Sequence, residues 1–227
     1  MPPPATEPGI ADDPRALTIL TTEHWGLLSA RGLAYNEAFT RASMYLTFVS
    51  MSLVALTLLA TATKFDATFL GIATLILGAD FVAGLLTTLR MTLARFEDTR
   101  ATMAVNRIRN AYLRISPGVE GFLVTSAHDD FRGMRVTETL GMRTSMGWVE
   151  NLASSGLMVG VITVLIGGTF VFTLLVNMGV DVVVARRIGG ITAIGLAVLA
   201  FGVVIPRVSR RFRDFETRFP TPPDETP

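Results

Sequence analysis

Residues 42–89 read ASMYLTFVSMSLVALTLLATAT-KFD-ATFLGIATLILGADFVAGLLTTL, and this stretch decides the fold. The part before KFD carries no charge, and the part after it carries one, Asp80. A helix that crosses the ~30 Å hydrocarbon layer needs about 20 apolar residues, because its backbone polar groups must be paired within lipid. The two runs therefore predict membrane-spanning helices at 42–63 and 67–89, joined by a tight turn into a first hairpin.

A second pair of apolar runs follows nearer the carboxyl terminus, within 151–206. We predict spans at about 155–177 and 188–206, the latter ended by Pro206. All four runs are continuously apolar and do not alternate, so they favour helices over the strands of a barrel. The sequence therefore predicts an all-α polytopic membrane protein with four transmembrane helices and a helical cytoplasmic subdomain.

The composition of the whole chain agrees with a membrane protein and excludes several other classes. Of the 227 residues, 50% are hydrophobic and 17% are charged, and the apolar residues gather in the four runs. Such clustering excludes a soluble enzyme with a conventional core, a fibrous repeat and a wholly disordered chain. A net charge of +1 gives no global basic field for nucleic acid.

No cofactor and no catalytic residue is expected from the sequence. The chain has no cysteine and two histidines, which excludes disulfides, thiolate metal sites and a multi-histidine metal site within one chain. Phosphate-binding, dinucleotide-binding, zinc-protease and serine-hydrolase motifs are all missing from it.

The positions of the basic residues predict how the chain is threaded through the membrane. Of 20 Lys and Arg residues, three precede the first span, nine lie between the second and third, and five follow the fourth. The other three, Lys64, Arg186 and Arg187, lie in the two short connections. Because basic residues are enriched on the cytoplasmic side, we expect both termini and the long middle segment to be cytoplasmic.

The amino-terminal part is predicted to be a tail followed by a helix. Residues 1–15 are rich in proline and polar residues, which favours a disordered tail. A cytoplasmic or interfacial helix is expected at 16–41, with Thr21 or Thr22 as its cap and an apolar stripe after it. This helix lies either at headgroup depth on the membrane or against the helix that follows the second span.

The middle and carboxyl-terminal parts are also predicted from their sequence. No glycine or proline interrupts 90–116, so the second span continues as a helix into a cytoplasmic helical segment, 90–150, until Ser116-Pro117-Gly118 ends it. Residues 207–227 form a basic juxtamembrane segment and a disordered tail. Arginines of that segment are expected to contact anionic lipid headgroups, namely Arg207, Arg210, Arg211 and Arg213.

An acidic residue within a span is the feature that departs most from what lipid requires. Asp80 is costly in a bilayer and is expected to face protein or water, together with hydroxyls at similar depth, Ser50, Ser52 and Thr163. Three roles remain open for it: a protonated, hydrogen-bonded structural contact, an acidic ring between subunits in a cation pathway, or a proton or cation site of a transporter.

A second candidate lies in the middle segment, at His128-Asp129-Asp130. An acidic pair after Thr125-Ser126 is typical of a helix start, where carboxylates are favoured. The alternative is a divalent metal site, for which Glu138, Glu150 or a second subunit must add ligands.

Two stretches of the chain resemble a known group of proteins. TEHWGLLSARGLAYNEAFTRASMY at 22–45 and NRIRNAYLRISPGVEGFLVTSAHDD at 106–130 are similar to uncharacterised bacterial, chiefly actinobacterial, multi-pass membrane proteins. The resemblance implies a common four-span architecture and carries over no functional residue.

These patterns together lead to an expectation about function. We expect a non-enzymatic integral protein of the bacterial cytoplasmic (inner) membrane that acts as a homo-oligomeric scaffold, signalling or accessory component. Small residues spaced by four, such as Gly156 and Gly160, favour close helix packing and self-association. The expected partners are membrane lipids, further copies of the chain and an unidentified membrane protein. The alternative is an oligomeric ion channel or transporter with Asp80 in the permeation pathway, and an enzyme acting through 128–130 is the least favoured interpretation.

Overall fold

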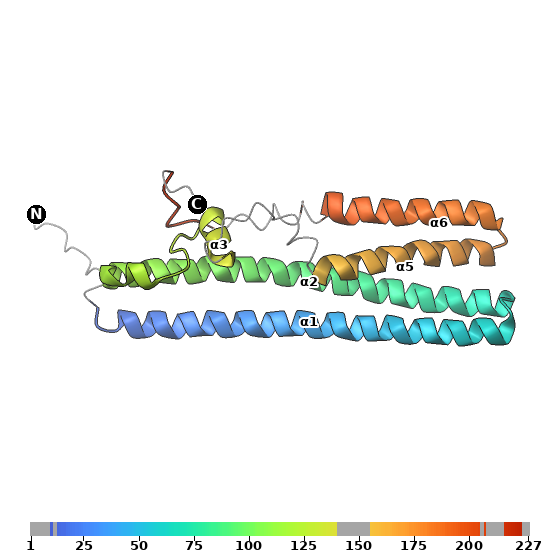
Figure 1. Cartoon of the computed structure of the whole chain (residues 1–227), viewed down its shortest axis with the longest axis horizontal. Helices are drawn as coiled ribbons and strands as arrows, with labels where there is room; N and C mark the ends of the chain where they lie inside the picture. Colours follow the sequence, from blue (N-terminus) through green and yellow to red (C-terminus); the bar gives the residue numbers. More distant parts are fainter. Residues whose placement is uncertain (1–9, 11–12, 140–154, 205–206, 208–215, 224–227) are drawn as a thin grey trace, which may run out of the picture. The chain divides into compact units, whose positions relative to one another are not determined.

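The computed structural model describes residues 10, 13–139, 155–204, 207 and 216–223 (Figure 1). In that part of the chain the regular elements are all helical. The chain divides into two compact units. Unit 1 gathers Met1–Tyr35, Phe96–Ser145 and Phe215–Pro227, and unit 2 gathers Asn36–Arg95 and Met146–Asp214.

The first helix, α1, spans Ala16–Thr63, so the two helical segments predicted over 16–63 are continuous. It begins after Asp13, whose carboxylate and carbonyl accept hydrogen bonds from the backbone N–H groups that follow. The expected cap at Thr21 or Thr22 is wrong, because both residues lie inside the helix. Nothing between Ala16 and Thr22 interrupts a helix, so the helix starts at residue 16, and its cap moves back to the acidic residue.

A three-residue turn joins α1 to the second helix, α2, which spans Ala67–Ile115. Lys64 and Phe65 both adopt the left-handed conformation, with φ of 51° and 61°, which reverses the chain in few residues. Asp66 then caps α2, because its carboxylate accepts a 2.9 Å hydrogen bond from Phe69 N–H. The structure confirms the long second helix and its end before Ser116.

The segment after α2 contains two short helices. A 3-10 helix, η1, spans Pro117–Phe122 and begins at the proline that ends α2. α3 spans Phe131–Glu138, and its cap is Asp130, whose side chain accepts from Gly133 N–H at 2.7 Å. The expectation that the acidic pair opens a helix is thus confirmed for Asp130.

The second hairpin consists of α5, Ser155–Asn177, and α6, Val182–Ala197, followed by the π-helical η2, Val198–Val204. α5 matches the predicted third span. α6 begins six residues before the expected start at 188, because Asp181 caps it by accepting from the N–H groups of Val183 and Val184. Arg186 and Arg187 therefore lie within α6 and not in the connection before it.

Glycines bring α5 and α6 together in unit 2. A Cβ built on Gly168 would come within 2.8 Å of the Gly189 carbonyl oxygen, and one on Gly189 within 2.7 Å of the Gly168 carbonyl oxygen. A Cβ on Gly160 would lie 2.9 Å from the Phe201 ring. These small residues pack within the chain, and self-association through the faces that bear them stays a prediction.

The described helices are long and apolar enough to cross a membrane four times, in α1, α2, α5 and the continuous stretch from α6 through η2. Large apolar side chains such as Leu58, Leu75 and Ile191 lie exposed on them. An apolar surface of this extent requires a nonpolar solvent around it. The chain is therefore an all-α polytopic membrane protein.

Candidate functional site

The acidic residue of the second span lies inside unit 2. The side chain of Asp80 on α2 is 1% exposed, and Ser52 on α1 is also buried. Ser52 Oγ donates a 3.0 Å hydrogen bond to Asp80 Oδ1. Leu77 and Ala73, one and two turns earlier on α2, are buried as well, so this face of α2 points inward as expected.

The other serine expected near Asp80 is placed elsewhere. Ser50 is exposed, and its Oγ donates to the Leu46 carbonyl of its own helix at 2.8 Å. Two residues apart on a helix means about 200° of rotation, so Ser50 and Ser52 cannot face one partner. The expected grouping of both serines with Asp80 is therefore corrected to Ser52 alone.

Thr163 on α5 belongs to a separate cluster of hydroxyl groups. It is buried, its Oγ1 lies 3.3 Å from the Tyr45 hydroxyl and 3.5 Å from Thr88 Oγ1, and it donates to the Val159 carbonyl at 2.8 Å. These hydrogen bonds connect α1, α2 and α5 and do not include Asp80. The expected contact of Thr163 with Asp80 is thus replaced by this hydroxyl cluster.

Tyr45 is, together with Thr88, a member of this cluster that the sequence analysis missed. Its ring belongs to the buried core of unit 2, with Ala42, Val49 and Val159. A tyrosine within an apolar span brings a hydroxyl that needs a partner, and this was the available signal. Gly84 leaves the space, because a Cβ there would overlap both the Tyr45 hydroxyl and Thr163 Oγ1.

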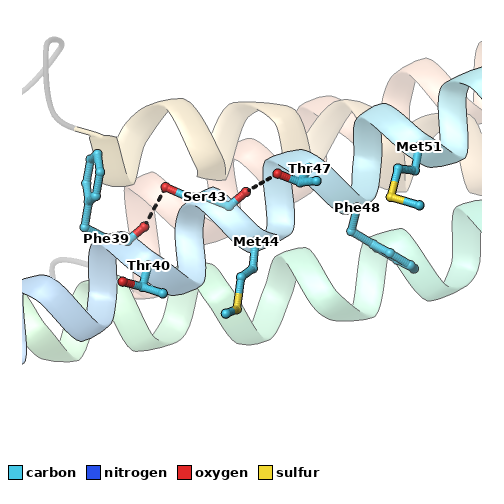
Figure 2. Close-up of a pocket in the computed structure, with 7 residues that line it drawn as sticks. All are labelled: Phe39, Thr40, Ser43, Met44, Thr47, Phe48 and Met51. Atoms are coloured by element: carbon cyan, nitrogen blue, oxygen red, sulfur yellow. Dashed lines mark hydrogen bonds between the residues drawn. The ribbon is translucent and has the colours of Figure 1, made fainter.

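One face of α1 forms a shallow groove of about 640 Å³ (Figure 2). Its lining alternates apolar side chains and hydroxyls along four turns, namely Phe39, Thr40, Ser43, Met44, Thr47, Phe48 and Met51. Ser43 and Thr47 each donate to a carbonyl four residues earlier, so their hydroxyls are satisfied within the helix. The groove offers shape and apolar contact and lacks a charged group.

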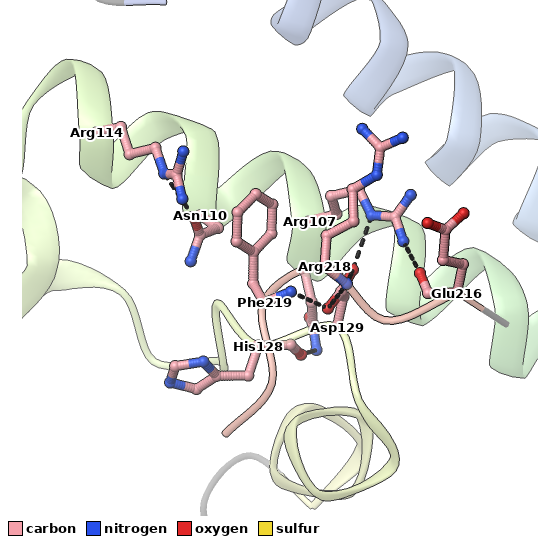
Figure 3. A network of polar contacts seen from close by, with 9 residues as sticks. Arg107, Asn110, Arg114, His128, Asp129, Glu216, Arg218 and Phe219 are labelled. Atoms are coloured by element: carbon pink, nitrogen blue, oxygen red, sulfur yellow. Dashed lines mark hydrogen bonds and ion pairs between the residues drawn. The ribbon is translucent and has the colours of Figure 1, made fainter. Parts of the chain in front are cut away.

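In unit 1, Asp129 lies at the centre of a polar network (Figure 3). It is fully buried, and Arg107 of α2 donates to its Oδ2 at 2.8 Å. The backbone N–H groups of Arg218 and Phe219 also donate to this carboxylate, at 3.1 and 2.7 Å. Asp129 thus neutralises a basic side chain and holds a segment 90 residues further along the chain.

Asp130 holds the same carboxyl-terminal segment at a second point. Its Oδ2 accepts from Thr221 N–H at 2.9 Å, and its Oδ1 accepts from the Thr221 hydroxyl at 2.7 Å. Burial alone would raise the pKa of Asp130, but the hydrogen bonds from Gly133 and Thr221 outweigh it and lower the pKa below its ordinary value. Thr221 lies in the tail expected to be disordered, so that expectation is wrong at this residue.

The metal site considered at 128–130 is not supported by this geometry. Both carboxylates are occupied by N–H and hydroxyl donors, and His128 presents its carbonyl to Asn106 Nδ2 at 2.9 Å. Over the residues that the structure describes, no group of three His, Cys, Asp or Glu side chains could hold a metal ion. Donors that carry hydrogen occupy the positions where a cation would have to bind.

Asn106 on α2 is a further polar residue that the sequence did not single out. It is fully buried, and its Oδ1 accepts from Thr137 Oγ1 and from Arg109, both at 2.9 Å. Together with its bond to the His128 carbonyl, this fixes α3 and the preceding loop against α2. Its place on a helix with many charges gave no signal of burial.

Of the four arginines expected at lipid headgroups, Arg207 is described and exposed. Arg210, Arg211 and Arg213 lie outside the described residues. The structure thus leaves their contact with lipid as a prediction.

The fold and these sites define a polytopic membrane protein with four candidate spans and a polar unit formed by segments outside the spans. Comparison of the chain with protein-family models, curated proteins and solved structures finds no match.

Proposed function

We propose that the chain is a non-enzymatic, homo-oligomeric scaffold or accessory protein of the bacterial inner membrane. The observation that carries the proposal is the burial of Asp80 and its hydrogen bond to Ser52. In this position the carboxyl serves to join α1 and α2 within one chain. The choice of the bacterial inner membrane is part of the proposal and follows from the expected resemblance of 22–45 and 106–130 to bacterial multi-pass membrane proteins.

Contacts within unit 1 support the proposed threading with both termini in the cytoplasm. Arg31, before the first span, pairs with Asp98, after the second. Arg107 pairs with Asp129, which binds the backbone of Phe219 after the fourth span. Segments in contact must share one side of a membrane, and the arginine distribution favours the cytoplasmic side.

The channel alternative places Asp80 in an acidic ring between subunits. A carboxyl in such a ring faces the pathway, whereas Asp80 faces the interior of its own unit. The geometry therefore favours the structural role over permeation.

The groove on α1 supports assembly with a second copy of the chain. Thr40, Met44, Thr47 and Met51 follow each other at spacings of four, three and four, which is the spacing of a helix seam that receives another helix. We assign the groove to α1 of another subunit, and lipid occupancy is the contrary outcome of the test below.

The role of Asp80 is tested in full-length protein reconstituted into liposomes. We expect no ion flux above that of empty liposomes, and Asp80→Asn leaves the free energy of unfolding nearly unchanged because an amide still accepts from Ser52. Ser52→Ala lowers this free energy by about 0.6 to 1.7 kcal/mol, and the matched Ser50→Ala changes it little. A flux that disappears in Asp80→Asn would establish the channel instead.

Assembly through the groove is tested by cysteine cross-linking, for which the cysteine-free chain provides a clean background. Met44→Cys and Met51→Cys place thiols on groove residues that are 66% and 67% exposed, and Leu75→Cys places the control on α2 at 74%. Oxidation in membranes should give disulfide-linked dimers for the first two and not for the control, because a disulfide requires Cα atoms within about 7 Å. Equal cross-linking at all three sites, or none, contradicts the assignment.

A further inference from the structure

The carboxyl-terminal residues Glu216–Thr221, here called the tail segment, are bound mainly through their backbone. The N–H groups of Arg218 and Phe219 donate to Asp129, and the Asp129 N–H donates to the Phe219 carbonyl at 3.1 Å. One of these bonds joins two main-chain groups, as in strand addition, and in the others the main chain of the tail segment donates to a side-chain carboxylate. Arg107 also donates to the Glu216 carbonyl.

Two side chains of the tail segment add recognition to these backbone contacts. The Phe219 ring lies under the Arg114 guanidinium, whose Cζ is 4.5 Å from the ring centre. The Thr221 hydroxyl donates to Asp130. Pro220, between Phe219 and Thr221, has no backbone N–H, and the N–H groups of both its neighbours donate to the site.

The groups described above that bind the tail segment come from residues 107–130. Arg107 and Arg114 are placed by α2, and Asp130 is fixed as the cap of α3. Asp129 forms an ion pair with Arg107, and neither residue belongs to the tail segment. These binding groups are therefore positioned by elements of the chain that do not include the tail segment.

We propose that residues 107–130 form a peptide-binding site for an extended segment of the pattern Xaa-Phe-Pro-Thr, in which Xaa is any residue with a backbone N–H, and that the tail segment is its detachable ligand. The site reads the N–H groups of the first, second and fourth positions, an aromatic ring at the second and a hydroxyl at the fourth. This binding function is additional to the scaffold role and does not depend on it.

The test uses the full chain, with its own tail segment weakened, and a fluorescent peptide of residues 214–223, DFETRFPTPP. Phe219→Pro combined with Thr221→Pro removes two donating N–H groups, the ring and the hydroxyl, and leaves the binding residues unchanged. This variant should bind the peptide at least about tenfold more tightly than the native chain, where the linked segment competes at an effective concentration of about millimolar. Hydrogen exchange at Asp129 should rise in the variant as the segment detaches.

Peptide variants test the recognition without any risk to the fold of the protein. N-methylation at Phe219 removes one N–H and keeps the ring, and it should weaken binding about tenfold or more. Arg218→Ala in the peptide keeps the N–H, changes an exposed side chain and should alter binding by about twofold at most. Equal binding to both chains, equal binding of the N-methylated peptide, a segment that stays docked in the variant, or no binding up to about 5 mM peptide would each overturn the proposal.

Discussion

The hydroxyl groups of Tyr45 and Thr163 lie 3.3 Å apart, although 118 residues separate them in the chain. This contact joins α1 of the first hairpin to α5 of the second within unit 2. In lipid there is no hydrophobic driving force between two apolar helix surfaces. Close packing and polar contacts such as this one therefore hold the two hairpins together.

A double-mutant cycle measures this contact. Tyr45→Phe and Thr163→Val each remove one hydroxyl, and their combined effect on unfolding in mixed micelles should be less than additive by about 0.6 kcal/mol. Thr57→Val is the control, because Thr57 is exposed and donates within its own helix. Additive effects of the first pair would show that the hydroxyls do not interact.

The close approach of α5 and α6 predicts opposite behaviour of two neighbouring glycines. Gly189→Ala brings a Cβ against the Gly168 carbonyl and should lower the free energy of unfolding by about 1 to 3 kcal/mol. Gly190→Ala meets nothing within 4 Å and should be neutral or stabilising, since alanine favours a helix by up to about 1 kcal/mol. Chemical unfolding of the two variants checks the difference, and an equal loss in both would contradict the packing.

The lowered pKa of Asp130 predicts a loss of stability in acid. A carboxyl whose folded pKa lies below the unfolded value near 3.9 contributes stability that is fully present above about pH 4 and is lost as pH falls through the folded pKa. Unfolding of native protein by urea at several pH values should show this decline. Asp130→Asn should flatten the decline, and an unchanged slope in that variant would assign it to other groups.

His24 predicts a second pH dependence, near neutrality. Burial, with a smaller effect of the Arg109 charge, lowers the pKa of His24, whose Nδ1 lies 3.3 Å from the Tyr112 hydroxyl. The unfolded chain therefore takes up the proton first, and stability falls as pH drops below about 6.5. The chain has two histidines, so NMR titration resolves two imidazole rings, and the signal that is lost in His24→Gln belongs to His24. This titration measures the pKa of His24 directly. A His24 pKa at or above 6.5 would refute the prediction.

The sequence predicted the helices well because the solvent of the spans dictates length and polarity. The third span and the long α2 agree with the structure almost residue for residue. The cap of α1 and the start of α6 were placed too late, because apolar content marks where a helix enters lipid and not where hydrogen bonding begins. Asp13 and Asp181, which fix those starts, lie outside the apolar runs.

The sites were harder to predict than the helices, because their partners are distant in sequence. Asp80 was predicted to face the protein interior because an acidic residue is costly in lipid. Ser52 was predicted to lie near it because the two residues are at similar depth in the membrane. The same criterion of depth also selected Ser50, which lies on the opposite face of α1. Nothing local to Asp129 indicates that its ligands are backbone amides 90 residues away. Backbone N–H donors leave no residue-specific pattern in a sequence. The acidic pair Asp129-Asp130 is therefore compatible both with a metal site and with a site that binds a peptide backbone.

The two connections 64–66 and 178–181 are short, and each is closed by an aspartate that starts the next helix. If unit 1 lies in the cytoplasm, as proposed, these two connections are the parts of the described chain that face the outside. Proteases or antibodies added to intact cells would then have few accessible sites on the protein. The same reagents would cleave or bind it after the membrane is permeabilised and unit 1 becomes accessible.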